Sequence, residues 1–137
     1  MTNDELMHEA EQAREMAYAP YSGFTVGAAL LTKDGTVYRG CNIENAAFGP
    51  SNCAERTAFF KAVSEGKRDF VKIAITGGKR GTSATDTCSP CGVCRQVMME
   101  FCDPQEFVIL LRDGQGGVME KTLSQLLPLG FGAGNLQ

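Results

Sequence analysis

Three cysteines and one glutamate have the types and spacing of a metal centre that is open to water. Cys53 stands two residues before Glu55, and Cys91 and Cys94 follow as a Cys-x-x-Cys pair directly after Pro90. Three thiolates occupy three positions of a tetrahedral zinc ion, and the fourth then holds water, as in catalytic but not in structural zinc sites. We therefore predict one Zn²⁺ per subunit, bound by the three cysteines, with Glu55 free to carry protons.

Cys88 leaves two other kinds of metal site open. A closed structural zinc site would use Cys88 as a fourth ligand. An iron–sulfur centre would use the run Cys88, Cys91 and Cys94, but the next cysteine, Cys102, does not follow at the ferredoxin spacing. Neither alternative gives Glu55 a chemical role, so the sequence favours the open catalytic site.

Two helices are expected to position these ligands. Residues 53–65 and 91–101 show helical spacing of apolar residues, and each range begins with a cysteine. Free N–H groups and the positive end of the helix dipole favour a thiolate at such a start. Glu55 shares the pocket only if Cys53 lies at the mouth of its helix, because residues two apart otherwise diverge by about 200°. Arg56 is expected to hydrogen-bond the ligand sulfurs and draw charge from them.

The other elements follow from apolar periodicity and turn residues. Thr2 and Glu5 form a capping pattern before a helix whose apolar stripe extends to Ala17. Strands alternate with helices, which predicts an α/β fold with a mixed sheet and helices on its faces. We expect residues 1–137 to form one domain. Strands are predicted at residues 24–32, 36–43, 70–76, 107–111 and 118–121, a loop from Gly77 to Pro90, and a last helical turn at 122–127.

Composition restricts the class of partner. The formal net charge of −3 provides no basic surface for a polyphosphate backbone, so we expect a small-molecule ligand and no nucleic acid. No stretch approaches the roughly 20 apolar residues that span a bilayer, and the acidic N-terminus lacks an apolar signal core. Six cysteines in such a chain indicate metal binding rather than disulfides. We expect a reduced cytoplasmic protein with no membrane contact.

Five motifs, at residues 19–24, 40–46, 53–58, 89–96 and 126–132, extend over nearly the whole chain. On these motifs the sequence resembles the small tetrameric cytidine deaminases. The resemblance implies a three-layer α/β/α fold with a mixed five-stranded sheet, zinc ligation by the three cysteines, and Glu55 as proton shuttle. It also implies deamination of free cytidine and deoxycytidine to uridine and deoxyuridine in pyrimidine salvage, by a homotetramer with shared active sites.

The same resemblance implies a set of substrate contacts. Asn42 and Glu44, which we expect to alternate on one face of a strand, match residues that hydrogen-bond the ribose hydroxyls. Phe24 matches an aromatic residue that packs on the pyrimidine. The backbone around Ala54 and Ser89 is expected to contact the polar edge of the base.

The C-terminal segment and one loop complete these expectations. Phe131 matches a residue that reaches into the pocket of a neighbouring subunit. The loop from Gly77 to Cys88 is long for the family, and Phe48 stands where a tyrosine is frequent.

Two alternative functions stay open. A deaminase of an aminonucleoside antibiotic of the blasticidin type is the alternative enzyme. A non-catalytic zinc module with a closed four-cysteine site is the alternative outside enzymes.

Overall fold

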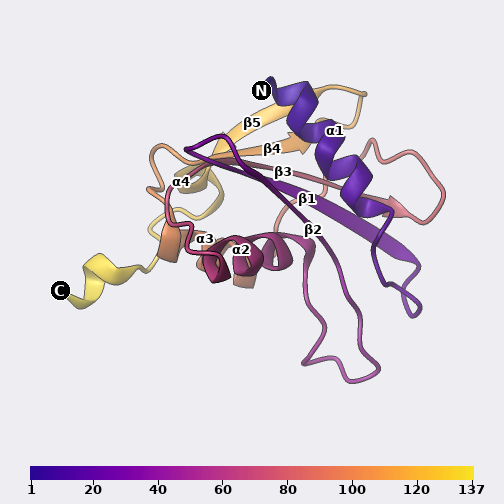
Figure 1. The fold of residues 1–137 in the computed structure, drawn as a ribbon, viewed down its shortest axis with the longest axis horizontal. Coiled ribbons are helices and arrows are strands. Elements are labelled where there is room, and N and C mark those ends of the chain that lie inside the picture. Colours follow the sequence, from indigo (N-terminus) through magenta and orange to yellow (C-terminus); the bar gives the residue numbers. More distant parts are fainter.

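A mixed five-stranded sheet forms the centre of the computed structural model, which describes residues 1–137 (Figure 1). Its strand order is β2-β1-β3-β4-β5. Strands β3 and β4 pair in parallel, and all other neighbours are antiparallel. The predicted mixed sheet is confirmed. The strands are β1 (Phe24–Thr32), β2 (Val37–Cys41), β3 (Phe70–Lys79), β4 (Val108–Arg112) and β5 (Val118–Thr122).

Helices cover both faces of this sheet, which gives the expected three layers (Figure 1). Helix α1 packs on one face, and helices α2 and α3 pack on the other. None of the helices has the length and apolar character needed to cross a membrane. The helices are α1 (Asn3–Arg14), α2 (Ala54–Ser64), α3 (Gly92–Phe101), α4 (Leu123–Leu126) and the 3₁₀ helix η1 (Ala133–Leu136), which projects from the body at the C-terminus.

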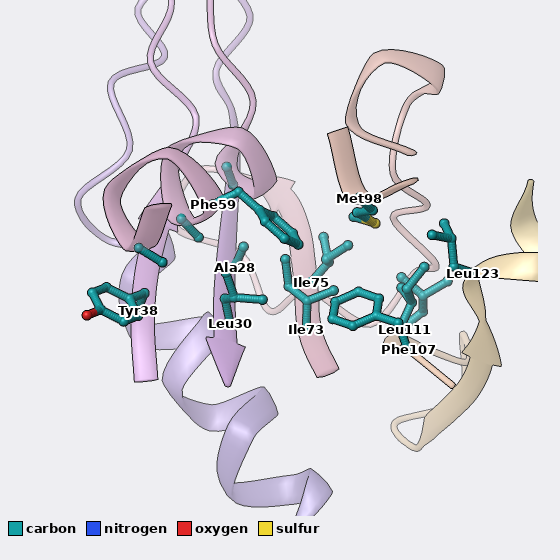
Figure 2. Close-up of a cluster of buried hydrophobic side chains, with 14 residues drawn as sticks. Ala28, Leu30, Tyr38, Phe59, Ile73, Ile75, Met98, Phe107, Leu111 and Leu123 are labelled. Carbon is teal, nitrogen blue, oxygen red and sulfur yellow. The ribbon is translucent and has the colours of Figure 1, made fainter. Parts of the chain in front are cut away.

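The larger apolar cluster lies between the sheet and helices α2 and α3 (Figure 2). Phe59 of α2 is fully buried there, and its ring centroid lies 5.1 Å from that of Phe70 and 6.0 Å from that of Phe107. Phe101 at the end of α3 stacks on Phe59 at 6.3 Å. Burial of one such side chain contributes about 1.5–3 kcal/mol. This aromatic group therefore fixes α2 and α3 relative to each other, and with them the cysteines at their N-termini.

Two strand glycines let helices approach the sheet closely. A Cβ on Gly40 of β2 would fall 2.6 Å from the backbone nitrogen of Ala58 in α2. A Cβ on Gly27 of β1 would fall 2.6 Å from the backbone nitrogen of Arg14 in α1. Real Cβ atoms do not make such contacts, so glycine is required at both positions. Gly40 thereby seats the first turns of α2, which carry Glu55, directly on the sheet.

Three boundaries differ from the predictions. β2 ends at Cys41, so Asn42 and Glu44 do not lie on a strand: the Asn42 side chain accepts the hydrogen bond of the Val26 N–H, and the chain then leaves the sheet. β3 continues to Lys79, beyond the predicted loop start, because the glycines of that segment pair with β1. α1 ends at Arg14, three residues before the predicted stripe ends, although Ala17 is buried.

Candidate metal centre and substrate pocket

Three sulfur atoms meet where α2 and α3 begin. The Sγ atoms of Cys53, Cys91 and Cys94 all lie within 4.8 Å of one another, with 3.8 Å between Cys53 and Cys91 and 3.4 Å between Cys91 and Cys94. Sulfurs at the Zn–S distance of about 2.3 Å in a tetrahedron are about 3.8 Å apart. The group therefore fits three corners of a zinc site. Cys88 lies outside this group, so the geometry does not favour the closed four-cysteine site or the iron–sulfur centre.

Local backbone geometry explains how the ligands reach this position. Cys53 and Cys91 are the N-cap residues of α2 and α3, and both have an extended backbone. Neither cysteine caps its helix with a side-chain hydrogen bond, so the first N–H groups and the positive dipole ends face the sulfurs. Cys53 thus lies at the start of its helix. This is the position required for Cys53 and Glu55 to share a pocket.

Arg56 contacts the sulfur group as predicted. Its Nη2 donates to Sγ of Cys53 at 3.2 Å, and its Nε is buried with no hydrogen-bond partner. A hydrogen bond from the Cys94 thiol, supported by Arg56, lowers the pKa of Cys53 to about 5. The donor set therefore presents a thiolate at neutral pH, and Arg56 offsets part of its negative charge. This chemistry suits a divalent cation with affinity for sulfur.

Glu55 lies beside the sulfurs in the first turn of α2. Its side chain is buried, and the loss of hydration raises its pKa to about 7. The negative charge of Cys53 raises the pKa further, and a backbone N–H opposes the shift. A carboxyl group with such a pKa can both accept and release a proton near neutral pH.

A cavity of about 450 Å³ opens in front of Glu55 and two of the sulfur ligands. Its volume lies in the range of small-molecule sites. Five of the predicted site residues line it together with these ligands and Glu55, although they come from three separate segments. These five are Asn42, Glu44, Ala54, Arg56 and Ser89.

Asn42 and Glu44 are held rigidly at the end of the cavity near β1. Asn42 accepts from the Val26 N–H at 2.8 Å and donates to the Phe24 carbonyl at 2.9 Å. Glu44 accepts from the N–H groups of Tyr21 and Ser22 at 2.9 and 3.1 Å, and also from the Ser22 hydroxyl. The Ser22 hydroxyl lowers the pKa of Glu44, so this carboxylate is ionised at neutral pH. Both side chains keep further hydrogen-bonding capacity for a ligand.

Two of the predicted substrate contacts, Phe24 and Phe131, do not line this cavity. Phe24 is 41% exposed and borders a neighbouring hollow formed with Gly77 and the following loop. Phe131 is 56% exposed, and its carbonyl accepts from Gln96 Nε2 at 2.8 Å. The fold of one chain therefore does not bring Phe131 to the pocket of that chain.

Sequence reasoning gave no role in the pocket to three apolar residues that line the cavity, Val26, Cys88 and Val93. Val26 stands two residues after Phe24 on β1, and the period of a strand could have placed the two on one face. Burial raises the pKa of Cys88 to about 11, so its thiol is neutral at physiological pH. Val26 and Cys88 together provide an apolar wall of the pocket.

A family model described as the cytidine and deoxycytidylate deaminase zinc-binding region matches residues 1–111. The chain belongs to this deaminase family. A cytidine deaminase from Halalkalibacterium halodurans is 54% identical over 133 residues, which cover 97% of this chain and 96% of that protein. One from Sporosarcina psychrophila is 50% identical over 131 residues, covering 96% and 92%.

Solved structures of the deaminase family agree with the fold. The crystal structure of cytidine deaminase from Burkholderia pseudomallei superposes with a TM-score of 0.85 at 48% identity, covering 96% of this chain and 100% of that chain. That from Mycobacterium tuberculosis gives a TM-score of 0.79 at 38% identity, covering 94% and 96%. The matching family region is a zinc-binding one, and the group of three sulfurs is where this deaminase chain can hold the ion.

Proposed function

We propose that this chain catalyses the zinc-dependent hydrolytic deamination of free cytidine and deoxycytidine to uridine and deoxyuridine, a reaction of pyrimidine salvage. One observation carries the proposal. A buried carboxyl group, Glu55, and two members of the group of three thiols, Cys53 and Cys91, face the same small-molecule cavity. Asn42 and Glu44, which are held by hydrogen bonds, stand at its other end.

Cys53, Cys91 and Cys94 are proposed to hold the zinc ion. When bound, zinc acts as a Lewis acid that lowers the pKa of a water molecule toward neutrality. Arg56 hydrogen-bonds Cys53 and reduces the negative charge of the three thiolates. Because excess negative charge at the ligands would make that water a poorer acid, Arg56 supports the reaction without contacting the substrate.

Glu55 is proposed to move the protons of the reaction. It takes a proton from the attacking water, whose oxygen adds to C4 of the pyrimidine, and delivers that proton to N3. It then helps to protonate the amino group, the C4–N bond breaks, and ammonia leaves. The pKa of about 7 suits both the acceptance and the release of the proton.

Asn42 and Glu44 are proposed to bind the ribose hydroxyls, and the backbone at Ala54 and Ser89 to contact the polar edge of the base. The Ser89 hydroxyl accepts from Arg95 at 3.0 Å, so its side chain is already engaged. The ionised Glu44 would repel a 5′-phosphate, which favours a free nucleoside over a nucleotide. Deoxycytidine is accepted if the 3′ and 5′ hydroxyls are the ones bound.

The active enzyme is proposed to be a cytoplasmic homotetramer with shared active sites. All six cysteines are free, as expected in a reducing compartment. Phe131 and Phe48 are largely exposed, and Phe48 stands at the rim of the cavity. We propose that Phe131 enters a neighbour's pocket, where Phe24 packs on the pyrimidine.

A mixing experiment tests the shared site. Glu55→Ala and Phe131→Ala subunits, each of low activity alone, are co-refolded in equal amounts. Partial recovery of activity supports a site built from two chains, since some pockets then combine an intact Glu55 with an intact Phe131. Absence of recovery in assemblies that light scattering proves to be mixed would contradict it.

Zinc content and ammonia release from cytidine test the reaction itself. The zinc-loaded protein is expected to convert cytidine and deoxycytidine, and to turn over cytidine monophosphate far more slowly. Blasticidin serves as the competing substrate, although the similar proteins reported above are cytidine deaminases and do not favour that alternative. A preference for the nucleotide, or a protein that releases no ammonia from any nucleoside, would refute the proposal.

A further inference from the structure

We infer that Cys88 is a specificity-determining residue of the pocket, whose thiol faces the C5 edge of the pyrimidine and limits the size of a C5 substituent. The inference rests on the proposed function. It assigns no bond-making step to the thiol, only the shape of the wall that the thiol forms.

We place the Cys88 side chain next to the base of the nucleoside and not next to its sugar. It lines the cavity next to Ser89 and close in sequence to the ligand Cys91, whereas Val26 lies beside Asn42 at the end proposed for the ribose. Val26 and Cys88 are both half-buried and pack on the larger apolar cluster. The apolar wall thus runs from the sugar end to the metal end, and Cys88 forms the part nearest the reacting carbon.

The orientation of the ring follows from its two fixed ends. C4 must face the sulfur group, and N1, on the opposite side of the ring, carries the ribose toward Asn42 and Glu44. The N3 edge faces Glu55, which stands in the first turn of α2, just after the N-cap residue Cys53. The C5 edge is then directed away from α2, toward the segment that leads from Cys88 to Cys91.

Gly77 determines how deep the Cys88 thiol lies. A Cβ on Gly77 would fall 2.9 Å from Sγ of Cys88, 3.0 Å from Cγ2 of Val26 and 3.1 Å from Cε1 of Phe24. Gly77 pairs with Val26 in the sheet and does not line the cavity itself. Because Gly77 has no side chain, the side chains of Cys88 and Val26 can occupy the space next to it. A larger residue at position 77 would displace them toward the pocket.

The readout is the ratio of kcat/KM for 5-methylcytidine to that for cytidine, measured on zinc-loaded protein. Cys88→Val adds bulk to the wall and is expected to lower this ratio by about 10-fold or more, since one methyl group in a tight pocket discriminates by about 10- to 200-fold. Cys88→Ala removes the sulfur and is expected to raise the ratio. Gly77→Ala, outside the pocket, is expected to lower it. Cys102→Val, at a half-buried cysteine remote from the cavity, is the matched control and should leave it unchanged.

Product binding provides a readout that is independent of turnover. The ratio of the dissociation constant for 5-methyluridine to that for uridine, measured by calorimetry, should change in the opposite direction to the kcat/KM ratio, because a poorer fit raises a dissociation constant. It should rise in Cys88→Val and Gly77→Ala and fall in Cys88→Ala, so the two alanine variants still test the inference if Cys88→Val does not fold. Active wild-type protein with both ratios unaltered in the Cys88 variants would overturn this inference alone. Zinc-loaded wild-type protein without activity on cytidine would overturn the proposed function, and this inference with it.

Discussion

Arg56 donates a hydrogen bond to the sulfur of Cys53 at 3.2 Å, while its own Nε is buried without a partner. The guanidinium is thus held against the sulfur group by the first turn of α2, three residues after the cysteine it contacts. A cation fixed in this place acts directly on a ligand sulfur.

Substitution of Arg56 should therefore lower the rate without removing the metal. Arg56→Gln keeps a donor near Cys53 but removes the positive charge, and we expect kcat to fall by about 10- to 100-fold with zinc content unchanged. Arg56→Lys, which keeps the charge, should retain more activity. Equal activity in the glutamine variant and the wild type would show that the charge is not used.

Substitution of Glu55 should abolish turnover and spare the metal site. We expect Glu55→Ala to lose about 10⁴-fold or more in kcat, because one carboxyl group serves several proton transfers. Zinc analysis should still find one ion per chain. Glu15→Ala, at an exposed glutamate just after α1, is the control and should remain active. A zinc-loaded Glu55→Ala protein with near wild-type activity would refute the assigned role.

Cys88 and Cys91, which are three residues apart in the sequence, should respond differently to replacement by serine. Cys91→Ser removes a ligand, so we expect loss of zinc and of activity. Cys88→Ser should retain its zinc, because Cys88 lies outside the sulfur group. Metal analysis after gel filtration decides the matter. Loss of zinc from the Cys88 variant would revive the closed four-cysteine site.

The pKa of Glu44 should depend on Ser22. The Ser22 hydroxyl is the largest cause of its lowered pKa, so we expect Ser22→Ala to raise the pKa, as followed by a carboxyl NMR titration. A lowered pKa in the folded state stabilises the protein above the unfolded value of about 4.3, and this contribution disappears as the pH falls through the folded value. The Ser22 contribution should therefore be present at pH 7 and lost in acid. An unchanged titration in Ser22→Ala would contradict this.

The close approach of α2 to β2 should make Gly40 sensitive to any side chain. We expect Gly40→Ala to lower the free energy of unfolding by about 1–3 kcal/mol or more, because its Cβ would overlap the backbone of Ala58. Urea unfolding of the zinc-loaded protein measures the change. Gly134→Ala is the control, since its Cβ would meet nothing within 4 Å. Equal destabilisation in the two variants would contradict this packing.

The metal site and most helices and strands could be predicted from the sequence, because they depend on residues close together in the chain. Thiol ligands are specified by residue type and short spacing, and the N-cap positions of Cys53 and Cys91 depend on only a few neighbouring residues. Apolar periodicity likewise predicted all five strands, with β1 at the observed bounds. The resemblance to a known family, rather than this periodicity, supplied the substrate contacts.

Tertiary structure decided what depends on residues distant in the sequence. The register of β1 on β3 places Gly77 behind Cys88 and Val26, and so turns a cysteine with no assigned role into part of the pocket wall. The hydrogen bonds that hold Glu44 come from Tyr21 and Ser22, more than twenty residues earlier. No local pattern encodes such pairings, because they form only when strands and loops far apart along the chain pack against the same helix N-termini.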